Sequence, residues 1–322
     1  MPAHTVLVIA HPTARHLRLL DQLPPQTRLA VGESTEAFAN LAPEAGIILN
    51  GGHHAETLAS VFAMAPQVKW VHSLSAGVDK LLFPALKASP VPLTNSRGIY
   101  SKSLAEWGML GMLFFAKDVR RLLRQQAASR WEQFDCVELR GQTLGIIGYG
   151  TIGQETALRA KSFGMKIHAM RRRPELFHGD PIVDQGYAPG QILELMAASD
   201  YVLMSLPLTG GTTAMVGERE LRAMKPSGVL LNLGRGSSLV EADLVRALRE
   251  GWIRGAALDV FETEPLPKTS PLWQLENLFL SPHSADHTDT WQDDAMRFFL
   301  ENFARWDAGE ALENIVDKEA GY

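Results

Sequence analysis

The chain has 322 residues, of which 46% are hydrophobic and 21% charged, and its formal net charge is −5. This length exceeds what one hydrophobic core usually supports, so we expect two folded domains and exclude a disordered chain. The weak negative charge supplies no basic field for a polyanion, so we expect a small-molecule ligand and neither a nucleic-acid nor a membrane partner.

Short β-branched runs alternate with helical patterns over the first 100 residues, which predicts a parallel sheet with helices on its faces. The segment Met1–Thr5 carries no lysine or arginine, and the apolar run after it is too short for a signal peptide. The single cysteine, Cys136, cannot close an intrachain disulfide, and we therefore expect a cytoplasmic protein. The predicted strands are Val6–Ala10, Arg28–Val31, Gly46–Leu49, Trp70–Ser73 and Val91–Thr94.

A helical pattern follows over residues 101–134, first apolar and then basic around Arg120, Arg121 and Arg124. Its most apolar part, Trp107–Ala116, is far shorter than the ~20 residues that a membrane-spanning helix needs, so we interpret it as a buried helix. The whole segment is long enough to join two domains.

A second alternation of strands and helices completes the chain and predicts a full dinucleotide-binding sheet. A last helix, Trp291–Ala308, is expected to pack back on the first domain. The predicted class is α/β, with two Rossmann-like, doubly wound domains of parallel strands and the active site in the cleft between them. We expect residues 1–100 plus 286–322 to form a flavodoxin-like substrate domain and residues 101–285 to form the dinucleotide-binding domain. The six strands of the latter are Thr143–Ile147, Lys166–Met170, Tyr201–Ser205, Gly228–Leu231, Ala256–Val260 and Leu278–Ser281.

Three glycines between the first of these strands and a helical run have the spacing G-x-G-x-x-G. Glycines in this position allow a tight turn and close backbone approach, and the helix N-terminus offers free N–H groups to a pyrophosphate. The alternative is an ordinary turn from strand to helix. The predicted cofactor-binding residues here are Gly148, Tyr149, Gly150, Thr151, Ile152 and Gly153.

Arginines follow the next strand, where NAD-binding proteins usually have a carboxylate for the ribose hydroxyls. The residues are Arg171, Arg172 and Arg173. Guanidinium groups match phosphate oxygens bidentately, so Arg171 and Arg172 predict NADP(H) as the preferred cofactor, with NAD(H) possible. The alternative is a solvated basic loop.

Three further motifs occur in order: residues 224–236, which end in Leu-Gly-Arg-Gly, residues 256–265, and Ser281-Pro-His283. With the glycine turn, they make the chain similar to the D-isomer-specific 2-hydroxyacid dehydrogenases from about Val68 to Thr288. The resemblance implies that Arg235 binds the substrate, that His283 is the general acid and base, and that Glu264 is its acidic partner. An arginine can hold a carboxylate, and a histidine can donate a proton to a carbonyl oxygen as hydride arrives.

Other positions of the family's site fall on both predicted domains. Asp259 matches a residue beside the nicotinamide carboxamide, although an aspartate at a strand end could equally cap a loop. In the first domain the loop Ser75, Ala76 and Gly77 matches the one whose backbone N–H groups receive the substrate carboxylate; a plain turn is the alternative. The remaining cofactor-binding residues that the resemblance implies are Leu206, Pro207, Thr212, Leu233, Gly234 and His283.

One pair of residues departs from the family's usual pattern, and a set of aromatic residues leaves the identity of the substrate open. Asp286 and His287 stand where relatives have a small glycine-containing run, and they would either alter substrate preference or face solvent. Aromatic side chains either border the substrate cleft or belong to the core. They are Tyr100, Trp107, Trp131 and Trp291.

The resemblance implies an oxidoreductase that acts on CH–OH donors and reduces a small 2-oxo acid, of the glyoxylate or hydroxypyruvate type, to the D-2-hydroxy acid. Two alternatives are a dehydrogenase for another side chain and a non-catalytic NAD(P)-sensing protein that binds a partner. No metal site is predicted. In the family, the region corresponding to residues 101–134 joins two subunits, which implies a homodimer. Helix 102–117 could instead complete its own core.

Overall fold

The computed structural model describes residues 4–52 and 54–322, which belong to two compact units. The first unit is Met1–Tyr100 with Thr288–Tyr322, and the second is Ser101–His287. The chain therefore leaves the first unit, forms the second as an insertion, and returns to the first. From the sequence, this return is expected after residue 285.

The first unit contains a five-stranded sheet in which every pairing is parallel. The strand order β2-β1-β3-β4-β5 is the flavodoxin-like order, in which a switch point lies beside β1. Nearly every residue of β1, β3, β4 and β5 is buried, which explains why these strands read as apolar runs in the sequence. The strands are β1 (Thr5–Ile9), β2 (Arg28–Gly32), β3 (Ile47–Asn50), β4 (Trp70–Ser73) and β5 (Leu93–Asn95).

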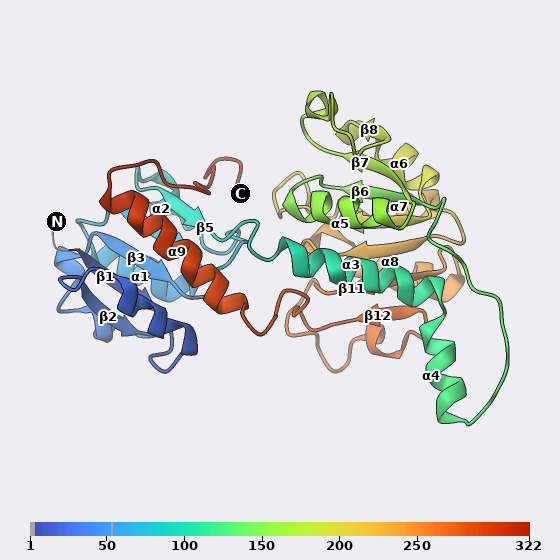
Figure 1. The fold of residues 1–322 in the computed structure, drawn as a ribbon, viewed down its shortest axis with the longest axis horizontal. Helices are drawn as coiled ribbons and strands as arrows, with labels where there is room; N and C mark the ends of the chain where they lie inside the picture. The colour runs from blue at the N-terminus through green and yellow to red at the C-terminus, as the bar shows by residue number, and fades with distance from the viewer. Residues whose placement is uncertain (1–3, 53) are drawn as a thin grey trace. The chain divides into compact units, whose positions relative to one another are not determined.

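Helix α9 (Trp291–Asp307) returns the chain to this sheet (Figure 1). Its Phe299 stacks on Trp70 of β4 with ring centroids 5.4 Å apart, and both side chains are fully buried. The other helices are short, and three of them are 3-10 helices. They are η1 (Arg15–Gln22), η2 (Thr35–Phe38), η3 (Ala42–Glu44), α1 (Ala55–Met64) and α2 (Pro84–Ala88).

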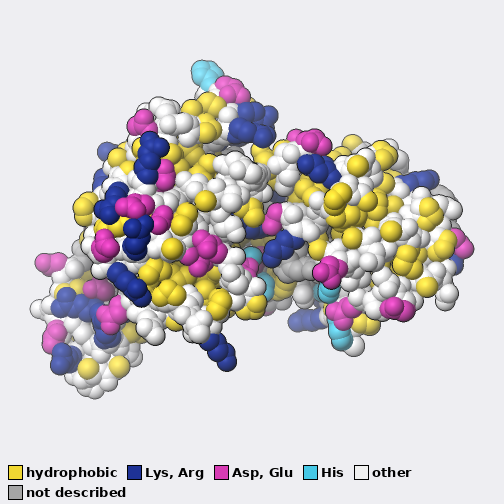
Figure 2. Space-filling view, turned by 180° about the vertical axis from the view of Figure 1, so that it is seen from behind, with side chains coloured by type: hydrophobic (Ala, Val, Ile, Leu, Met, Phe, Trp, Pro, Cys, Tyr) yellow, Lys and Arg dark blue, Asp and Glu magenta, His cyan; other side chains and the backbone are white. Residues whose placement is uncertain are grey.

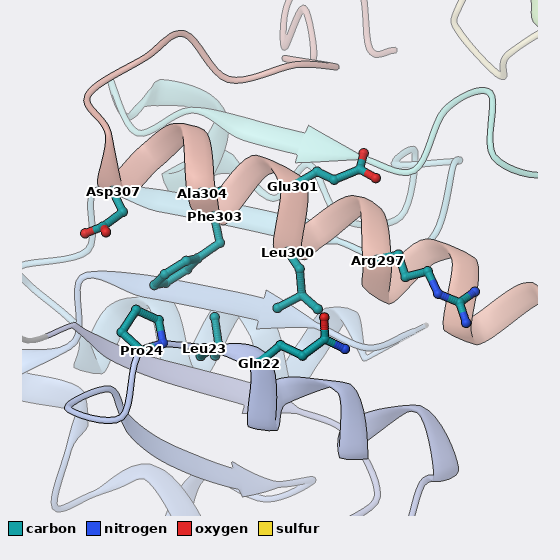
Figure 3. A pocket seen from close by; sticks show the side chains of 9 residues that line it. All are labelled: Gln22, Leu23, Pro24, Arg297, Leu300, Glu301, Phe303, Ala304 and Asp307. Carbon is teal, nitrogen blue, oxygen red and sulfur yellow. The ribbon is translucent and has the colours of Figure 1, made fainter.

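A groove of about 490 Å³ lies between the end of η1 and one side of α9 (Figure 3). Gln22, Leu23 and Pro24 line one wall. The other wall comes from α9 and is mixed, with the ring of Phe303 between charged side chains. No residue predicted from the sequence to bind cofactor or substrate lines this groove.

The second unit contains a seven-stranded parallel sheet of order β12-β11-β10-β9-β6-β7-β8. This is the Rossmann order with one strand added beyond β11, and it confirms the predicted fold class. The prediction of six strands was wrong, because it missed the three-residue edge strand β8, in which no residue is fully buried. The strands are β6 (Thr143–Ile147), β7 (Lys166–Met170), β8 (Gln185–Tyr187), β9 (Tyr201–Met204), β10 (Val229–Asn232), β11 (Gly255–Leu258) and β12 (Leu278–Leu280).

Helix α3 (Ser101–Ala116) packs on its own sheet, because Gly108 and Gly111 let it approach Leu231 and Leu233 closely. The predicted helical segment 101–134 is not continuous. Asp118 takes a left-handed conformation (φ +47°), and its carboxylate accepts from the Arg121 N–H, which begins a separate helix. That helix projects from the body of the unit (Figure 1) and ends before a long irregular segment. The remaining helices are α4 (Val119–Ala127), α5 (Thr151–Ser162), α6 (Ile192–Ala198), α7 (Glu218–Ala223) and α8 (Glu241–Glu250), with the 3-10 helices η4 (Pro174–Phe177), η5 (Pro189–Gln191), η6 (Gly236–Ser238) and η7 (Pro271–Gln274).

Within residues 4–52 and 54–322, no helix combines the length and the apolar character needed to span a bilayer. On the face drawn in Figure 2, lysine and arginine side chains are interspersed with aspartate and glutamate. Opposite charges in such close alternation cancel at a distance, so this face carries no extended field of one sign.

Candidate active site

The glycine turn joins β6 to α5 in the second unit, and its first glycine is required by the backbone. Gly148 has φ +98°, and a Cβ atom there would lie 2.9 Å from the carbonyl oxygen of Ser205. The Gly148 N–H donates to the carbonyl of Met170 at the end of β7, over 3.0 Å. The turn is thus fixed between the carboxyl ends of β7 and β9, where open α/β sheets bind ligands.

The second glycine of the motif borders open space, whereas the third is tightly packed. Gly150 is the N-cap residue of α5, and a Cβ atom there would meet nothing within 4 Å. A Cβ atom on Gly153 would lie 2.7 Å from the carbonyl oxygen of Gly148. Gly153 therefore allows helix and turn to pack, whereas Gly150 leaves open space over the first N–H groups of a twelve-residue helix. A dinucleotide pyrophosphate fits this cradle.

The arginine run begins immediately beside this turn. The carbonyl of Met170 accepts from both Gly148 and Tyr149, and Arg171 is the next residue along the chain. Its guanidinium lies 5.5 Å from the centroid of the Phe177 ring. No carboxylate stands at the end of β7, where the sequence reads Met170-Arg-Arg-Arg-Pro. Guanidinium groups at this strand end could bind the oxygens of a phosphate.

Two loops, after β9 and β10, meet close to the glycine turn. The hydroxyl of Thr212 donates to the carbonyl of Pro207 over 2.7 Å and closes the first loop. A Cβ atom on Gly234 would lie 2.7 Å from the carbonyl oxygen of Leu206, so the loops touch backbone to backbone. The Leu233 N–H extends the β9 ladder by donating to the carbonyl of Met204. The predicted cofactor-binding residues of these loops and of the glycine turn therefore lie together at the carboxyl ends of the parallel strands.

Arg235 is held by its backbone neighbours. One guanidinium nitrogen donates to the carbonyl of Gly234 over 2.9 Å, and the side chain is half-buried. Gly236 packs so tightly against Phe261 that a Cβ atom would overlap its carbonyl carbon. Since neither glycine tolerates a side chain, the path of the chain on both sides of Arg235 is set.

Glu264 and His283 form a hydrogen-bonded pair across two loops. His283 Nδ1 lies 2.8 Å from one carboxylate oxygen of Glu264, and the other oxygen accepts from the Phe261 N–H over 2.9 Å. The hydrogen bond to Glu264 raises the pKa of His283, although burial and the Arg235 guanidinium oppose it. The imidazole is only partly exposed, with 37% of its surface accessible. A histidine held in this way is suited to carry a proton near neutral pH.

Asp259 holds the loop that carries this histidine. Its buried carboxylate accepts from the Ser281 hydroxyl over 2.6 Å and from the N–H groups of Ser284 and Ala285 over 2.9 and 3.2 Å. Burial raises the pKa of Asp259, and these hydrogen bonds oppose the rise. The structure thus supports the loop-cap interpretation, and a contact with the nicotinamide carboxamide stays a prediction. In the sequence Ser281 forms part of a motif, but no role was predicted for it or for Ser284.

The carbonyl oxygens of the loop after β4 accept hydrogen bonds from residues at the end of β5 and just after it. The carbonyl of Ser75 accepts from the Ser96 N–H over 3.3 Å, and that of Ala76 accepts from the Asn95 side-chain amide over 2.6 Å. Ser75, Ala76 and Gly77 all lie in the first unit and are half-buried. The sequence predicted the loop but not Asn95 and Ser96. A polar Asn-Ser pair at the carboxyl end of a parallel strand was the signal that could have found them.

The aromatic residues and the Asp286–His287 pair, whose roles the sequence left open, are either buried in the core or at least partly exposed on the surface. Trp107 is buried and stacks on Phe279 at 5.4 Å, so it is a core residue of the second unit. Tyr100 is also buried and contacts Trp291 edge-on at 6.1 Å. Trp131 is 93% exposed. Asp286 and His287 are both partly exposed, and His287 Nε2 lies 3.7 Å from a carboxylate oxygen of Asp286.

Comparisons with known proteins agree with this geometry. The family described as "D-isomer specific 2-hydroxyacid dehydrogenase, NAD binding domain" matches residues 109–285. A glyoxylate reductase of Korarchaeum cryptofilum is 34% identical over 270 residues, which cover 81% of this chain and 80% of the relative. Glyoxylate/hydroxypyruvate reductase B of Yersinia pestis is 30% identical over 327 residues and covers 99% of this chain and 98% of its own.

Among solved structures, a D-isomer specific 2-hydroxyacid dehydrogenase of Xanthobacter autotrophicus, in complex with NADPH and MES, superposes with a TM-score of 0.87. It is 27% identical in sequence, and the superposition covers 100% of both chains. The chain belongs to the D-isomer specific 2-hydroxyacid dehydrogenase family. It is an NAD(P)-dependent oxidoreductase of that family, as the sequence predicted.

Proposed function

We propose that this protein is an NADPH-preferring reductase that converts a small 2-oxo acid of the glyoxylate or hydroxypyruvate type to the D-2-hydroxy acid. The observation that carries the proposal is the Glu264–His283 hydrogen bond of 2.8 Å, beside Arg235 and on the same sheet edge as the glycine turn. The names of the Korarchaeum and Yersinia relatives support the substrate class.

The second unit would hold the cofactor. The free N–H groups at the start of α5 would bind the pyrophosphate over Gly150, and Arg171 with Arg172 would bind the 2′-phosphate. Asp259 would lie beside the nicotinamide carboxamide. When bound, NADPH supplies the hydride; the protein places the acid and excludes other reactions.

Arg235 and His283 would act on the acid itself. The guanidinium of Arg235 would bind the carboxylate and the oxo oxygen and fix C2 in position. His283, kept protonated by Glu264, would donate its Nε2 proton to the oxo oxygen as C2 accepts hydride. In the reverse direction the neutral imidazole would accept that proton from the hydroxyl. The proton and the hydride thus reach opposite ends of one carbonyl bond.

The loop after β4 would receive the carboxylate through its backbone. In a trans peptide, the N–H of a residue points opposite to the carbonyl that precedes it. The carbonyls of Ser75 and Ala76 point to Ser96 and Asn95, so the N–H groups of Ala76 and Gly77 point away from these residues. Two N–H groups on adjacent residues that do not donate within the protein could together bind a carboxylate.

A homodimer built on α4 and the segment after it completes the proposal. Leu122, Leu123 and Trp131 expose 45%, 57% and 93% of their surface, although each is apolar and α4 buries no residue in its own unit. A second copy would cover them. Light scattering should give twice the mass of one chain, and Leu123→Glu with Trp131→Glu should give one. A single-chain mass for the unaltered protein would reject the dimer.

The direct test is the loss of absorbance at 340 nm with NADPH or NADH and a panel of glyoxylate, hydroxypyruvate, pyruvate and phenylpyruvate. We expect oxidation of NADPH with glyoxylate or hydroxypyruvate preferred. Preference for pyruvate or phenylpyruvate would favour a dehydrogenase for another side chain. Binding of NADPH without turnover on any acid would favour a cofactor-sensing protein that binds a partner.

A further inference from the structure

The substrate loop of the first unit is fixed by a strand end that carries no motif of its own. The four consecutive carbonyls of residues 73–76 all accept hydrogen bonds from residues 95–100. The Tyr100 hydroxyl donates to the carbonyl of Leu74 over 2.5 Å, and the Ser96 hydroxyl donates to that of Ser73 over 3.3 Å. The four peptide planes that contain these carbonyls are therefore oriented by the last residue of β5 and the segment that follows it.

Asn95 donates directly to the loop that would bind the acid. Its side chain is 97% buried, and its amide donates to the carbonyl of Ala76 over 2.6 Å. Its amide oxygen accepts from the Arg97 N–H over 3.3 Å, which sets the direction in which the amide group points. Because the peptide between Ala76 and Gly77 is trans, this bond determines where the Gly77 N–H points.

The end of the chain in turn holds Asn95. Residue Ile315 forms an antiparallel bridge with Thr94 of β5, and the Val316 N–H donates to the carbonyl of Leu93 over 2.8 Å. Figure 1 shows this last segment running beside β5. Asn314 brackets Asn95: its carbonyl accepts from the Asn95 N–H over 3.3 Å, and its side-chain amide donates to the Asn95 carbonyl over 3.2 Å.

Asn314 adopts a left-handed conformation (φ +53°), which asparagine tolerates better than most residues. The same side-chain amide also donates to the carbonyl of Arg97 over 2.7 Å, so it ties both ends of the turn after β5. Asn314 thus fixes the backbone of Asn95, and the side chain of Asn95 contacts the substrate loop. This arrangement spans residues more than 200 positions apart in the chain.

We propose that Asn95 and Asn314 are positioning residues that link the C-terminal segment to the substrate loop and orient its two N–H groups for a carboxylate. Neither residue would touch the acid. The proposal rests on the proposed function for the identity of the acid, and its geometry concerns the first unit alone.

The test compares three variants by two readouts. Asn95→Ala removes the donor to Ala76, and Asn314→Gly removes the bracketing amide while allowing the left-handed backbone. Lys318→Met is the matched control. Lys318 lies in the same C-terminal segment, but its amine donates to the carbonyls of Leu86, Ser89 and Val91, none of which belongs to the substrate loop. Hydrogen exchange of the peptide spanning residues 72–80 is measured for each, together with KM, kcat and inhibition by oxamate.

We expect faster exchange of the 72–80 peptide in Asn95→Ala and Asn314→Gly but not in Lys318→Met. We also expect KM and the oxamate inhibition constant to rise roughly 10-fold in Asn95→Ala, and less in Asn314→Gly, with kcat and the affinity for NADPH almost unchanged. Faster exchange in Lys318→Met as well would show a general loosening and overturn the proposal.

Unchanged exchange in Asn95→Ala would overturn the proposal even if the enzyme reduces glyoxylate. Faster exchange confined to the two asparagine variants would support the positioning role even if none of the 2-oxo acids is turned over. In that case the proposed substrate class fails and the geometry of the loop stands. A fall in kcat with unchanged KM would also overturn the proposal, because it would place the asparagines in the chemical step.

Discussion

In the proposed function, the two units of this chain would contribute to the binding of a small acid in different ways. The second unit uses side chains and glycines that follow one another in short motifs, such as the turn around Gly150 and the segment around Arg235. The first unit would use backbone N–H groups of the loop after β4, which we propose are oriented by Asn95 of β5 and by Asn314 near the C-terminus. A catalytic side chain can be recognised in a sequence. The direction of a backbone N–H group cannot, because it depends on which distant residues form hydrogen bonds with the neighbouring carbonyl.

This difference also affects how each unit responds to substitution. Removing a reacting side chain from the second unit should abolish a chemical step, while removing a positioning side chain from the first should loosen binding by a smaller factor. Substitutions in each unit therefore test whether this contrast holds.

The largest effect should come from His283→Ala. Loss of a general acid typically costs about 100-fold to 10,000-fold in rate, so kcat for reduction should fall within that range. The affinity for NADPH, measured by fluorescence titration, should change little. His287→Ala is the matched control on the same loop, since its imidazole pairs with Asp286 at 3.7 Å rather than with Glu264. A kcat within a few-fold of the unaltered protein would remove His283 from the mechanism.

Replacing Arg171 and Arg172 together by serine should come next. Charge-assisted hydrogen bonds to a phosphate contribute enough that the Kd for NADPH should rise roughly 10- to 100-fold, with little change for NADH. Arg173→Ser, which removes an exposed charge from the same run, controls for the general loss of positive field. Equal losses for the two cofactors would contradict the assignment of a phosphate site to this strand end.

The glycine turn offers a pair of opposite outcomes. Gly150→Ala adds a methyl group to open space, so it should leave the melting temperature unchanged and weaken NADPH binding roughly 10-fold. Gly153→Ala forces a methyl group to within 2.7 Å of a carbonyl oxygen, so it should lower the melting temperature by several degrees. Calorimetry and cofactor titration separate the two. A destabilised Gly150→Ala would mean that the space over α5 is not reserved for a ligand.

Much of the fold could be predicted, because buried parallel strands appear as apolar runs. The bounds of β4, β6 and β7 agree with the prediction to the residue. The edge strand β8 was missed since it has three residues and no fully buried side chain. The break after α3 was missed because no glycine or proline marks it in the sequence. Asp118 adopts the left-handed conformation there.

The site divides in the same way. Glu264 and His283 lie 19 positions apart and could be recognised from their motifs, and the hydrogen bond between them was expected. The side-chain amides of Asn95 and Asn314 donate instead to backbone carbonyls, which every residue carries, so no motif marks the partner. Asn314 also lies 219 positions from Asn95. Only the fold brings them together. Asp259 lies between these cases: its position was predicted, but its hydrogen bonds to the His283 loop were not.

The smallest change should come from Glu264→Gln, which alters where on the pH scale the enzyme works. Glu264 raises the pKa of His283, as does the charge of Asp259 to a lesser degree, while burial and Arg235 lower it. Reduction needs the protonated imidazole, so its rate falls as the pH rises through this raised pKa. Glutamine keeps a hydrogen-bond acceptor but removes the charge, and the pKa of His283 should therefore drop.

The alkaline limb of kcat/KM for reduction should accordingly move to lower pH in Glu264→Gln, measured with NADPH and the preferred acid. Oxidation of the 2-hydroxy acid needs the neutral imidazole, so its acidic limb should move in the same direction and its activity at low pH should increase. A structural defect would lower both directions at every pH without moving either limb. Only the paired displacement identifies the carboxylate of Glu264 as the group that keeps His283 protonated, and it extends the contrast between the units to proton transfer, which the second unit controls with a side chain.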